Sequence, residues 1–401
     1  MTSAQKMVIK KWRDDYRYTY NRTIWYMKEM DSDTNFNKKD EIYNNPEYYD
    51  INQETSDLDS YNFEQQRHFL SDNDLRSLTV PMGSDTINPD IYETPYDIRE
   101  SAVFEAVKNR KSAISNLKNG NIGHFELKYK KKRDLSFTLG GFKNVKRISN
   151  NEFCVYKTLM PKDEKNILTA EKLHEGKYRE CSIHFDGLYY YLLIPENREK
   201  KYVSPNGLTC SIDPGVRTFA TLYCPDKEMC MKLGENLCER MFSIQEQIFQ
   251  LKSKLDKGGL TKKKRKFIKK IIFNKYRKIK NLQTEMHNKI SYFLCNNFKQ
   301  VVIPEFGSKN MISRDRNLHP EVKRKMMLLG HCKFLQRLKT KAEEFGTLIT
   351  IVDERYTTMT CSRCCARNNV GKKEEWECKG CKYEHDRDGN SSRNIFFKQF
   401  V

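Results

Sequence analysis

The spacing of apolar residues predicts helices in five parts of the chain. Apolar side chains recur every three or four positions in residues 5–30, 94–120, 237–255, 268–290 and 328–345, which is the period of an amphipathic helix. The second range opens with threonine and proline and ends at a glycine, as helices commonly do. A Gly-Gly pair lies between the third and fourth ranges, so these two long helices are predicted to form an antiparallel hairpin.

Alternation of apolar and polar residues replaces the helical period between residues 123 and 196. The runs HFELKYK, from His124, and LYYYLLI, from Leu188, are typical of strands. This region is therefore predicted to be a small antiparallel β domain. Short apolar runs that predict further strands follow at 208–213, 218–223, 301–303 and 348–352. Because these runs alternate with helices, the last part of the chain is predicted to be α/β.

These patterns divide the chain into three predicted domains. Residues 1–120 form a helical region that contains an acidic insertion, residues 31–90, rich in Asp, Asn, Ser and Tyr and without a sustained period. Residues 121–205 form the antiparallel β domain. Residues 206–401 form the α/β domain, with the helical hairpin at 235–298. The fold class is thus α/β and β, in several domains.

The charge of the chain is unevenly distributed. The formal net charge is +20, yet residues 31–100 contain 17 acidic and 5 basic residues, a net of −12, which leaves +32 for the rest. Such an excess predicts a polyanionic partner, most commonly nucleic acid. Residues 252–280 hold fourteen Lys and Arg and a single Asp, so the helical hairpin is a candidate track for phosphates. A solvated helix face is the alternative reading.

Two basic segments supply the candidate nucleic-acid-binding residues. The polar face of the first helix carries Lys10, Arg13, Arg17 and Arg22. The second segment is the start of the second hairpin helix, with Lys262, Lys263, Lys264, Arg265, Lys266, Lys269 and Lys270. Its KKKRK run also matches a nuclear import signal, although phosphate binding alone would account for it.

Cysteine and hydropathy patterns predict the compartment. No run approaches the ~20 apolar residues that span a bilayer, so no membrane association is expected. The 13 cysteines are odd in number, and nine of them are scattered without a disulfide framework, which favours a reducing, intracellular location. If the host is eukaryotic, the nucleus is the expected compartment.

Four cysteines form the most specific chemical motif. Cys361 and Cys364 make one Cys-x2-Cys pair, Cys378 and Cys381 make a second, and thirteen residues separate the pairs. Each pair presents two sulfurs to one ion, so the motif predicts a structural tetrahedral Zn²⁺ site. A redox dithiol or two disulfides are the alternatives. His385 is a weak alternative ligand, whereas His331 lies on an apolar stripe and is expected in the core.

Acidic residues stand at or just beyond the ends of the predicted strands of the α/β domain. Asp213, Glu305 and Glu354 follow strands, and Asp388 lies just beyond the cysteine motif. Carboxylates that converge at a sheet edge can hold two Mg²⁺ for phosphodiester hydrolysis. A turn or helix cap is the alternative role for each residue taken alone. Spacing and charge together favour a metal-dependent nuclease.

Three segments resemble motifs of one protein family. SIDPGVRTFAT, residues 211–221, resembles the first RuvC motif of TnpB and Fanzor proteins, and VVIPEFGSKNM, residues 301–311, resembles the second. YTTMTCSRC and WECKGCKYEHDRDGNSSRNI, within residues 356–395, are similar to their zinc ribbon and third motif. Weaker similarity extends to the first helix and to HFELKYKKKRDLSFTL, residues 124–139. The resemblance thus covers nearly all of the chain except residues 31–90.

The resemblance implies a fold and an activity. The fold would be an RNase H-like (RuvC) nuclease core with an inserted helical hairpin and a four-cysteine zinc ribbon at 357–384, after a helical recognition lobe and a β-barrel (wedge) domain. The activity would be RNA-guided, Mg²⁺-dependent cutting of double-stranded DNA beside a short flanking motif. The implied partners are an omega-type guide RNA and target DNA, and a monomeric ribonucleoprotein is expected.

Residue by residue, the resemblance assigns Asp213 and Asp388 as catalytic magnesium ligands. The second motif departs from the bacterial TnpB pattern, because Pro304 takes the position of the usual glutamate and Glu305 falls one residue later. A shift of one residue turns a side chain to the opposite face of a strand. Fanzor proteins show a similar arrangement with a relocated glutamate, which corresponds to Glu354 here. Glu354 is thus the preferred third ligand and Glu305 the fallback.

Two other functions remain open from the sequence. The shifted glutamate, and a first helix that begins where the family has a barrel strand, would also suit a catalytically weakened regulator that binds guide RNA or DNA. A transposase on an RNase H-like core is the other alternative. It would join transposon ends and need no RNA.

Overall fold

The computed structural model describes residues 1–33, 89–304 and 319–400, apart from 133, 135, 177, 198, 201–206 and 372. Most of the predicted acidic insertion, Glu305 and the end of the second motif lie outside the described residues. The chain divides into two compact units, Met1–Asn197 and Arg198–Val401, here called the amino-terminal and carboxy-terminal units. Among the described residues, no helix combines the length and the apolarity that crossing a bilayer requires.

Two helices of the amino-terminal unit pack against each other. Helix α1 (Ser3–Asp33) buries Trp12, Tyr16 and Met27 on the stripe that the sequence predicts. After the short helix η3 (Pro89–Glu93), helix α5 (Tyr96–Lys118) supplies Ile98 and Ala102 to the same core. Pro95 is the N-cap residue of α5, so this helix begins one residue later than predicted. Proline fits here because its fixed φ suits a helix start.

Two three-stranded antiparallel sheets complete the amino-terminal unit, with strand orders β1-β5-β6 and β2-β3-β4. The strands are β1 (Phe137–Phe142), β2 (Val145–Ser149), β3 (Glu152–Val155), β4 (Ile167–Leu168), β5 (Cys181–Phe185) and β6 (Tyr190–Leu193). Leu139, Phe142 and Ile183 of these strands belong to the same hydrophobic core as α1 and α5. Helices and sheets therefore share one core.

The run at residues 124–130 is not a strand, contrary to the sequence prediction. Phe125 and Leu127 are partly buried and alternate with exposed residues, which explains the strand-like pattern. The Asn21 side chain, however, satisfies the backbone of Lys130: its amide donates to the Lys130 carbonyl at 3.1 Å and its oxygen accepts from the Lys130 N–H at 2.8 Å. The segment is thus fixed to α1 at this point by a side chain.

A five-stranded mixed sheet, with strand order β11-β10-β7-β8-β9, forms the centre of the carboxy-terminal unit. β10 lies between β7 and β11 and is parallel to both, whereas β7, β8 and β9 are mutually antiparallel. The strands are β7 (Thr209–Pro214), β8 (Ala220–Cys224), β9 (Met229–Leu233), β10 (Gln300–Pro304) and β11 (Leu348–Val352). The sequence did not predict β9, which follows the short helix η4 (Pro225–Lys227).

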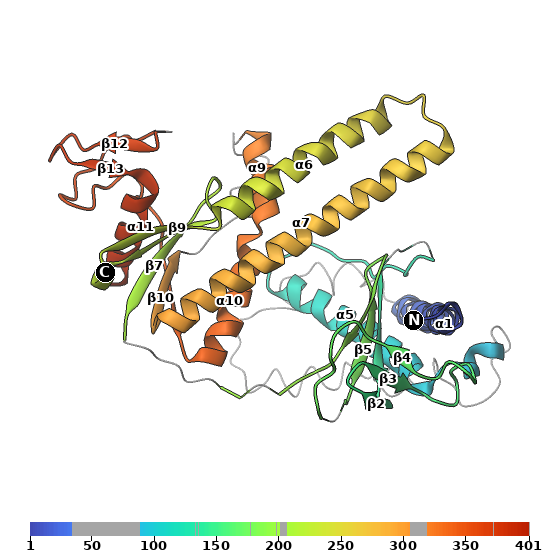
Figure 1. Cartoon of the computed structure of the whole chain (residues 1–401). Coiled ribbons are helices and arrows are strands. Elements are labelled where there is room, and N and C mark those ends of the chain that lie inside the picture. Colours follow the sequence, from blue (N-terminus) through green and yellow to red (C-terminus); the bar gives the residue numbers. More distant parts are fainter. Residues whose placement is uncertain are drawn as a thin grey trace. The chain divides into compact units, whose positions relative to one another are not determined.

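Two long helices form the predicted hairpin after β9. Helices α6 (Glu235–Asp256) and α7 (Lys262–Asn297) run side by side and are joined at their far ends (Figure 1). Their buried stripe, which includes Met241, Ile248 and Met286, belongs to the same core as the central strands. The side-chain oxygen of Thr261 accepts from the Lys264 N–H and caps α7.

The predicted helix at 328–345 is interrupted. Helix α9 (Pro320–Leu329) ends at Gly330, and helix α10 (His331–Phe345) begins after it. Gly330 has φ +65°, and a Cβ atom there would lie 2.7 Å from the Gln283 amide nitrogen. The apolar stripe continues across the break, so periodicity alone did not reveal it. The chain ends with β12 (Glu375–Glu377), β13 (Glu384–Asp386), α11 (Arg387–Phe397) and η5 (Lys398–Phe400).

Candidate active site and metal centre

Three acidic residues from distant parts of the sequence gather at one edge of the central sheet. Asp213 lies near the carboxyl end of β7, and Glu354 lies two residues beyond β11. Because β7 and β11 are both parallel to β10, their carboxyl ends meet at the same edge. Asp388 lies in the first turn of α11, which packs on β7 and β8.

Both of the other carboxyl groups affect the pKa of Asp213. Burial, together with the negative charges of Asp388 and then Glu354, raises the pKa of Asp213 to about 7, against a hydrogen bond from Ser391 and the charge of Arg387. Two carboxylates at one site disfavour each other's ionised form. Asp213 is therefore in the electrostatic field of both other acids, although they are 175 and 141 residues away in the sequence.

The other two acids have raised pKa values for related reasons. Burial raises the pKa of Glu354, and Asp353 adds to the shift. Burial also raises the pKa of Asp388, followed by Asp386, while Arg387, Arg217 and Lys232 oppose the rise. All three side chains are partly buried. Partial burial of carboxyl groups beside other acids is the situation that a bound cation would relieve.

The donor set fits Mg²⁺ better than a soft metal, because carboxylate oxygens are the ligands that hard cations prefer. In the described part of the chain, the only group of potential ligands whose atoms all lie within 4.8 Å of one another is a set of four cysteines. The three carboxylates do not form a group of this kind among the described residues. Glu305, the fallback ligand, lies outside the described residues.

Backbone and side-chain hydrogen bonds fix the start of α11. The Asp386 carboxylate caps the helix by accepting from the Gly389 N–H at 2.7 Å. The Ser211 hydroxyl, two residues before Asp213, donates to the Ser392 carbonyl at 2.6 Å, and both residues are buried. The strand that carries Asp213 is thus bonded directly to the helix that carries Asp388.

The four predicted cysteines converge in the cysteine loop, defined here as residues 357–384. The sulfurs of Cys361 and Cys381 are 3.7 Å apart, and those of Cys364 and Cys378 are 3.6 Å apart. A tetrahedron with metal–sulfur bonds of about 2.3 Å has edges of about 3.8 Å, so these spacings fit Zn²⁺. They are far longer than the ~2 Å of a disulfide bond, and all four cysteines are free thiols.

Polar groups around the sulfurs support a thiolate site. The His385 Nε2 atom lies 3.0 Å from the Cys361 sulfur, and with its proton on Nε2 the ring donates to that sulfur. The Asn368 amide donates to the Cys378 sulfur at 3.4 Å. Trp376 stacks on His385 with ring centroids 4.8 Å apart and holds the ring in place. His385 therefore contacts a cysteine of the group without belonging to it.

Two asparagines tie the cysteine loop to α11, and sequence reasoning did not assign them. The Asn394 amide donates to the carbonyls of Thr357 and Thr360, at 2.7 Å each. The Asn390 amide donates to the same carbonyls at 3.4 and 2.8 Å, and its oxygen accepts from the Ser362 N–H at 2.9 Å. Their spacing of four residues, which places them on one helix face, is the signal that could have found them.

The predicted nucleic-acid-binding residues of α1 lie in different surroundings. Lys10 is exposed. Arg13 is 2.7 Å from Asp14 and lies over the Phe137 ring, Arg17 is 4.0 Å from the same carboxylate, and Arg22 lies over the Tyr26 ring. These three arginines are partly buried and contribute to packing within the amino-terminal unit.

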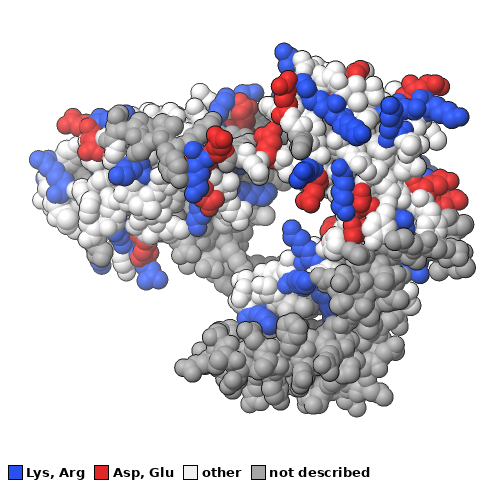
Figure 2. Space-filling model, turned by 90° about the horizontal axis from the view of Figure 1, so that it is seen from below, with Lys and Arg blue, Asp and Glu red and all other residues white. Residues whose placement is uncertain are grey.

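The predicted basic residues of α7 are all exposed: Lys262, Lys263, Lys264, Arg265, Lys266, Lys269 and Lys270. Phe267, within the same run, is 63% exposed. A basic helix face with an exposed aromatic ring is a surface on which phosphates and bases can both be bound. On the face seen in Figure 2, Lys and Arg are interspersed with Asp and Glu and do not form one continuous patch.

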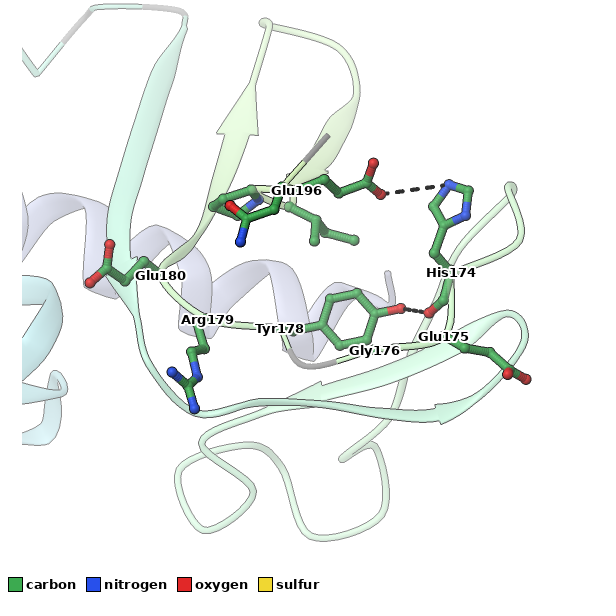
Figure 3. Close-up of a pocket in the computed structure, with 10 residues that line it drawn as sticks. His174, Glu175, Gly176, Tyr178, Arg179, Glu180 and Glu196 are labelled. Atoms are coloured by element: carbon green, nitrogen blue, oxygen red, sulfur yellow. Dashed lines mark hydrogen bonds and ion pairs between the residues drawn. The ribbon is translucent and has the colours of Figure 1, made fainter. Parts of the chain in front are cut away.

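A cavity of about 620 Å³ lies in the amino-terminal unit (Figure 3). The His174 imidazole points toward the Glu196 carboxylate, 3.8 Å away, and the Tyr178 hydroxyl donates to the His174 carbonyl. No group of metal ligands converges there among the described residues. Asp213, Glu354 and Asp388 do not line this cavity.

Comparison with known proteins finds relatives that are similar over most of the chain. A model of the Cas12f1-like TNB domain matches residues 331–395, which include the cysteine loop and Asp388. A TnpB-like protein of Acanthamoeba polyphaga mimivirus is 29% identical over 313 residues, which cover 74% of this chain and 56% of that protein. A putative transposase of Paramecium bursaria Chlorella virus 1 is 28% identical over 406 residues, which cover 99% and 84%. Together these matches support a TnpB/Fanzor-type protein.

The fold of this chain is similar to that of Cas12f1. The structure of a Cas12f1-sgRNA-target DNA complex superposes with a TM-score of 0.55 at 14% identity, over 97% of this chain and 82% of that one. At this identity the similarity concerns the mixed α/β fold. The alignment to the mimivirus protein spans little more than half of that protein's length.

Proposed function

We propose that this TnpB/Fanzor-type protein is an RNA-guided DNA endonuclease of the Fanzor kind. The observation that carries the proposal is the convergence of Asp213, Glu354 and Asp388 at one sheet edge. The strand order supports it, because three antiparallel strands followed by two parallel ones are expected of an RNase H-like core. The Cas12f1 structure with sgRNA and target DNA suggests the two partners.

In the proposed mechanism, each part of the chain has a physical task. The exposed lysines of α7 would bind backbone phosphates of the guide RNA and of its duplex with DNA, while base pairing selects the sequence. The three carboxylates would hold two Mg²⁺, which when bound supply an activated water and stabilise the leaving oxygen. Zn²⁺ in the cysteine loop would be structural, and through Asn390 and Asn394 it would fix the start of α11.

The experiment begins with the RNA. The protein is expressed with its flanking DNA, the copurifying RNA is sequenced, and a matching DNA target is incubated with the complex and Mg²⁺. We expect cutting by the parent and none by Asp213→Asn or Asp388→Asn. Cutting by both variants at the parental rate would exclude the proposed site.

A matched pair of variants tests the third ligand. Glu354→Gln is expected to abolish cutting, since its charge acts on Asp213 within the acidic cluster. Asp353→Asn is the control. The Asp353 carboxylate is the sequence neighbour of Glu354, but it is exposed and lies 3.8 Å from the Lys398 ammonium. Loss of cutting in Glu305→Gln with retention in Glu354→Gln would assign the role to Glu305.

A transposase-related function is the second candidate, favoured by the 84% coverage of the viral putative transposase. It predicts joined transposon ends, whereas an endonuclease leaves free ends. It also predicts that treatment with RNase before the reaction has no effect. Abolition of DNA processing by RNase would exclude it.

A further inference from the structure

A second cavity, of about 210 Å³, lies directly beside Asp388. Its walls are the turn after β7, strand β9, the first turns of α6, the part of the cysteine loop just before β12, the end of β13 and the start of α11. Three cationic side chains line it, those of Arg217, Lys232 and Arg387, together with five carboxylates, those of Glu235, Glu239, Glu374, Asp386 and Asp388. None of the three cationic residues was among the candidate residues from the sequence.

Strand register places Lys232 in line with the carboxylate site. Asp213 on β7 pairs with Thr221 on β8, and Thr221 pairs with Lys232 on β9. Residues directly opposite each other in neighbouring strands project from the same face. Two strand spacings amount to about 10 Å, so Asp213 and Lys232 lie in one row across the face that α11 covers.

Each of two cations is paired with an acid that belongs to a different element. The Arg217 guanidinium is 2.6 Å from the Glu374 carboxylate, and the Lys232 ammonium is 4.0 Å from the Asp386 carboxylate. All four side chains are about half exposed, between 46% and 64%. Ion pairs so exposed contribute little stability, and a phosphate can compete for either cation.

We propose that Arg217 and Lys232 form a subsite for the phosphodiester backbone of the DNA strand next to the carboxylates, and that Glu374 and Asp386 occupy these cations until the strand binds. The subsite rests on the proposed function in that it places the strand at the proposed metal ligands. A guanidinium matches a phosphate in two parallel hydrogen bonds, so exchange of Glu374 for phosphate preserves the donor geometry.

Electrostatics agree with this geometry. Arg217, Lys232 and Asp388 line the same cavity, so the two positive charges lie close to the site where the strand would be cut. Asp386, by contrast, is already engaged as the cap of α11, so release of Lys232 leaves its main hydrogen bond intact.

Binding of a short fluorescein-labelled single-stranded oligodeoxynucleotide tests the subsite without any cutting. The full chain, loaded with zinc and with its copurified RNA, is titrated without Mg²⁺ over a range of salt concentrations. Each phosphate contact contributes about 0.7 to the logarithmic salt slope for single strands. Arg217→Gln and Lys232→Gln are each expected to lower the slope by about that amount, whereas the control Lys289→Gln, which removes an exposed lysine paired with Glu285, is not. Unchanged slopes for both test variants would overturn the proposal.

Glu374→Gln is expected to change oligonucleotide binding in the opposite direction from Arg217→Gln and Lys232→Gln. Loss of the competing carboxylate releases Arg217 from this ion pair, so the oligonucleotide should bind about two to five times more tightly, the scale of an exposed ion pair. A purely structural ion pair predicts equal or weaker binding, which would refute the subsite. Thermal unfolding and zinc content check that each variant is folded.

The two proposals fail separately. Cutting by Asp213→Asn at the parental rate contradicts the endonuclease site even if the oligonucleotide results are as expected. Unchanged oligonucleotide binding contradicts the subsite even if Asp213→Asn abolishes cutting.

Discussion

Replacing Asn394 by alanine removes one of the two amide side chains that tie α11 to the start of the cysteine loop. Its amide donates to the carbonyls of Thr357 and Thr360 at 2.7 Å each. At about 0.5–1.5 kcal/mol for each hydrogen bond, the variant should lose about 1–3 kcal/mol of local stability. The Asn390 amide still donates to both carbonyls, so neither is left without a donor from α11.

The double variant Asn390→Ala with Asn394→Ala should lose more local stability than the sum of the losses in the two single variants. It removes both asparagine donors from each carbonyl, and a buried acceptor left unpaired costs about 1–3 kcal/mol. We therefore expect a coupling free energy of about 1–3 kcal/mol, well above the additivity error of about 0.5 kcal/mol for independent sites.

Hydrogen exchange measured by mass spectrometry is the assay, because it reports local opening. Peptides that cover residues 356–364 and 387–396 should exchange faster in each single variant and disproportionately faster in the double variant. Thr340→Ala in α10 is the control, since its hydroxyl bonds only within that helix, to Gln336. Additive effects, or acceleration of every peptide in the carboxy-terminal unit, would refute the proposed tie.

Other parts of the carboxy-terminal unit give three more predictions. Burial lowers the pKa of His287 and of His331 to about 4, against 6.5 in the unfolded chain, so unfolded chains take up protons first and stability should fall as the pH drops from about 6.5 to 4. Each histidine should lower the free energy of unfolding by up to about 1.4 kcal/mol for each pH unit. Urea midpoints that do not change over this range would contradict the lowered pKa values. Gly389→Ala should slow cutting several-fold with zinc content unchanged, because its Cβ would lie 3.2 Å from the Asp386 carboxylate and the Cys230 sulfur. Zinc removal by a chelator should increase hydrogen exchange in the cysteine loop and at the start of α11, whereas an effect confined to the loop would show that the two are not coupled.

Features with local causes were predictable from the sequence. The strand at 348–352 is confirmed, as are the two long hairpin helices, because each has its own period and its own breaker residues. The gathering of Cys361, Cys364, Cys378 and Cys381 is also confirmed, since Cys-x2-Cys turns place their sulfurs together. The core position of His331 is confirmed, where it donates to the Gly215 carbonyl at 2.9 Å.

Features that depend on tertiary contacts were not predictable. The break at Gly330 was hidden because the apolar stripe continues through it, and the φ of +65° at this residue shows why glycine is favoured. The alternating run at 124–130 carries strand periodicity, yet the Asn21 side chain satisfies part of its backbone. The pairing of Arg217 with Glu374 joins residues 157 apart in the sequence, and no local pattern reports it.

The position of divalent ions is the most direct test of the central claim that Asp213, Glu354 and Asp388 share a metal site. Crystals of the protein with its RNA would be soaked in Mn²⁺, and anomalous scattering would locate the ions. The account predicts two peaks about 4 Å apart among these three carboxylates, and their loss in Asp213→Asn. Mn²⁺ bound elsewhere in the carboxy-terminal unit, with none at these carboxylates, would contradict it.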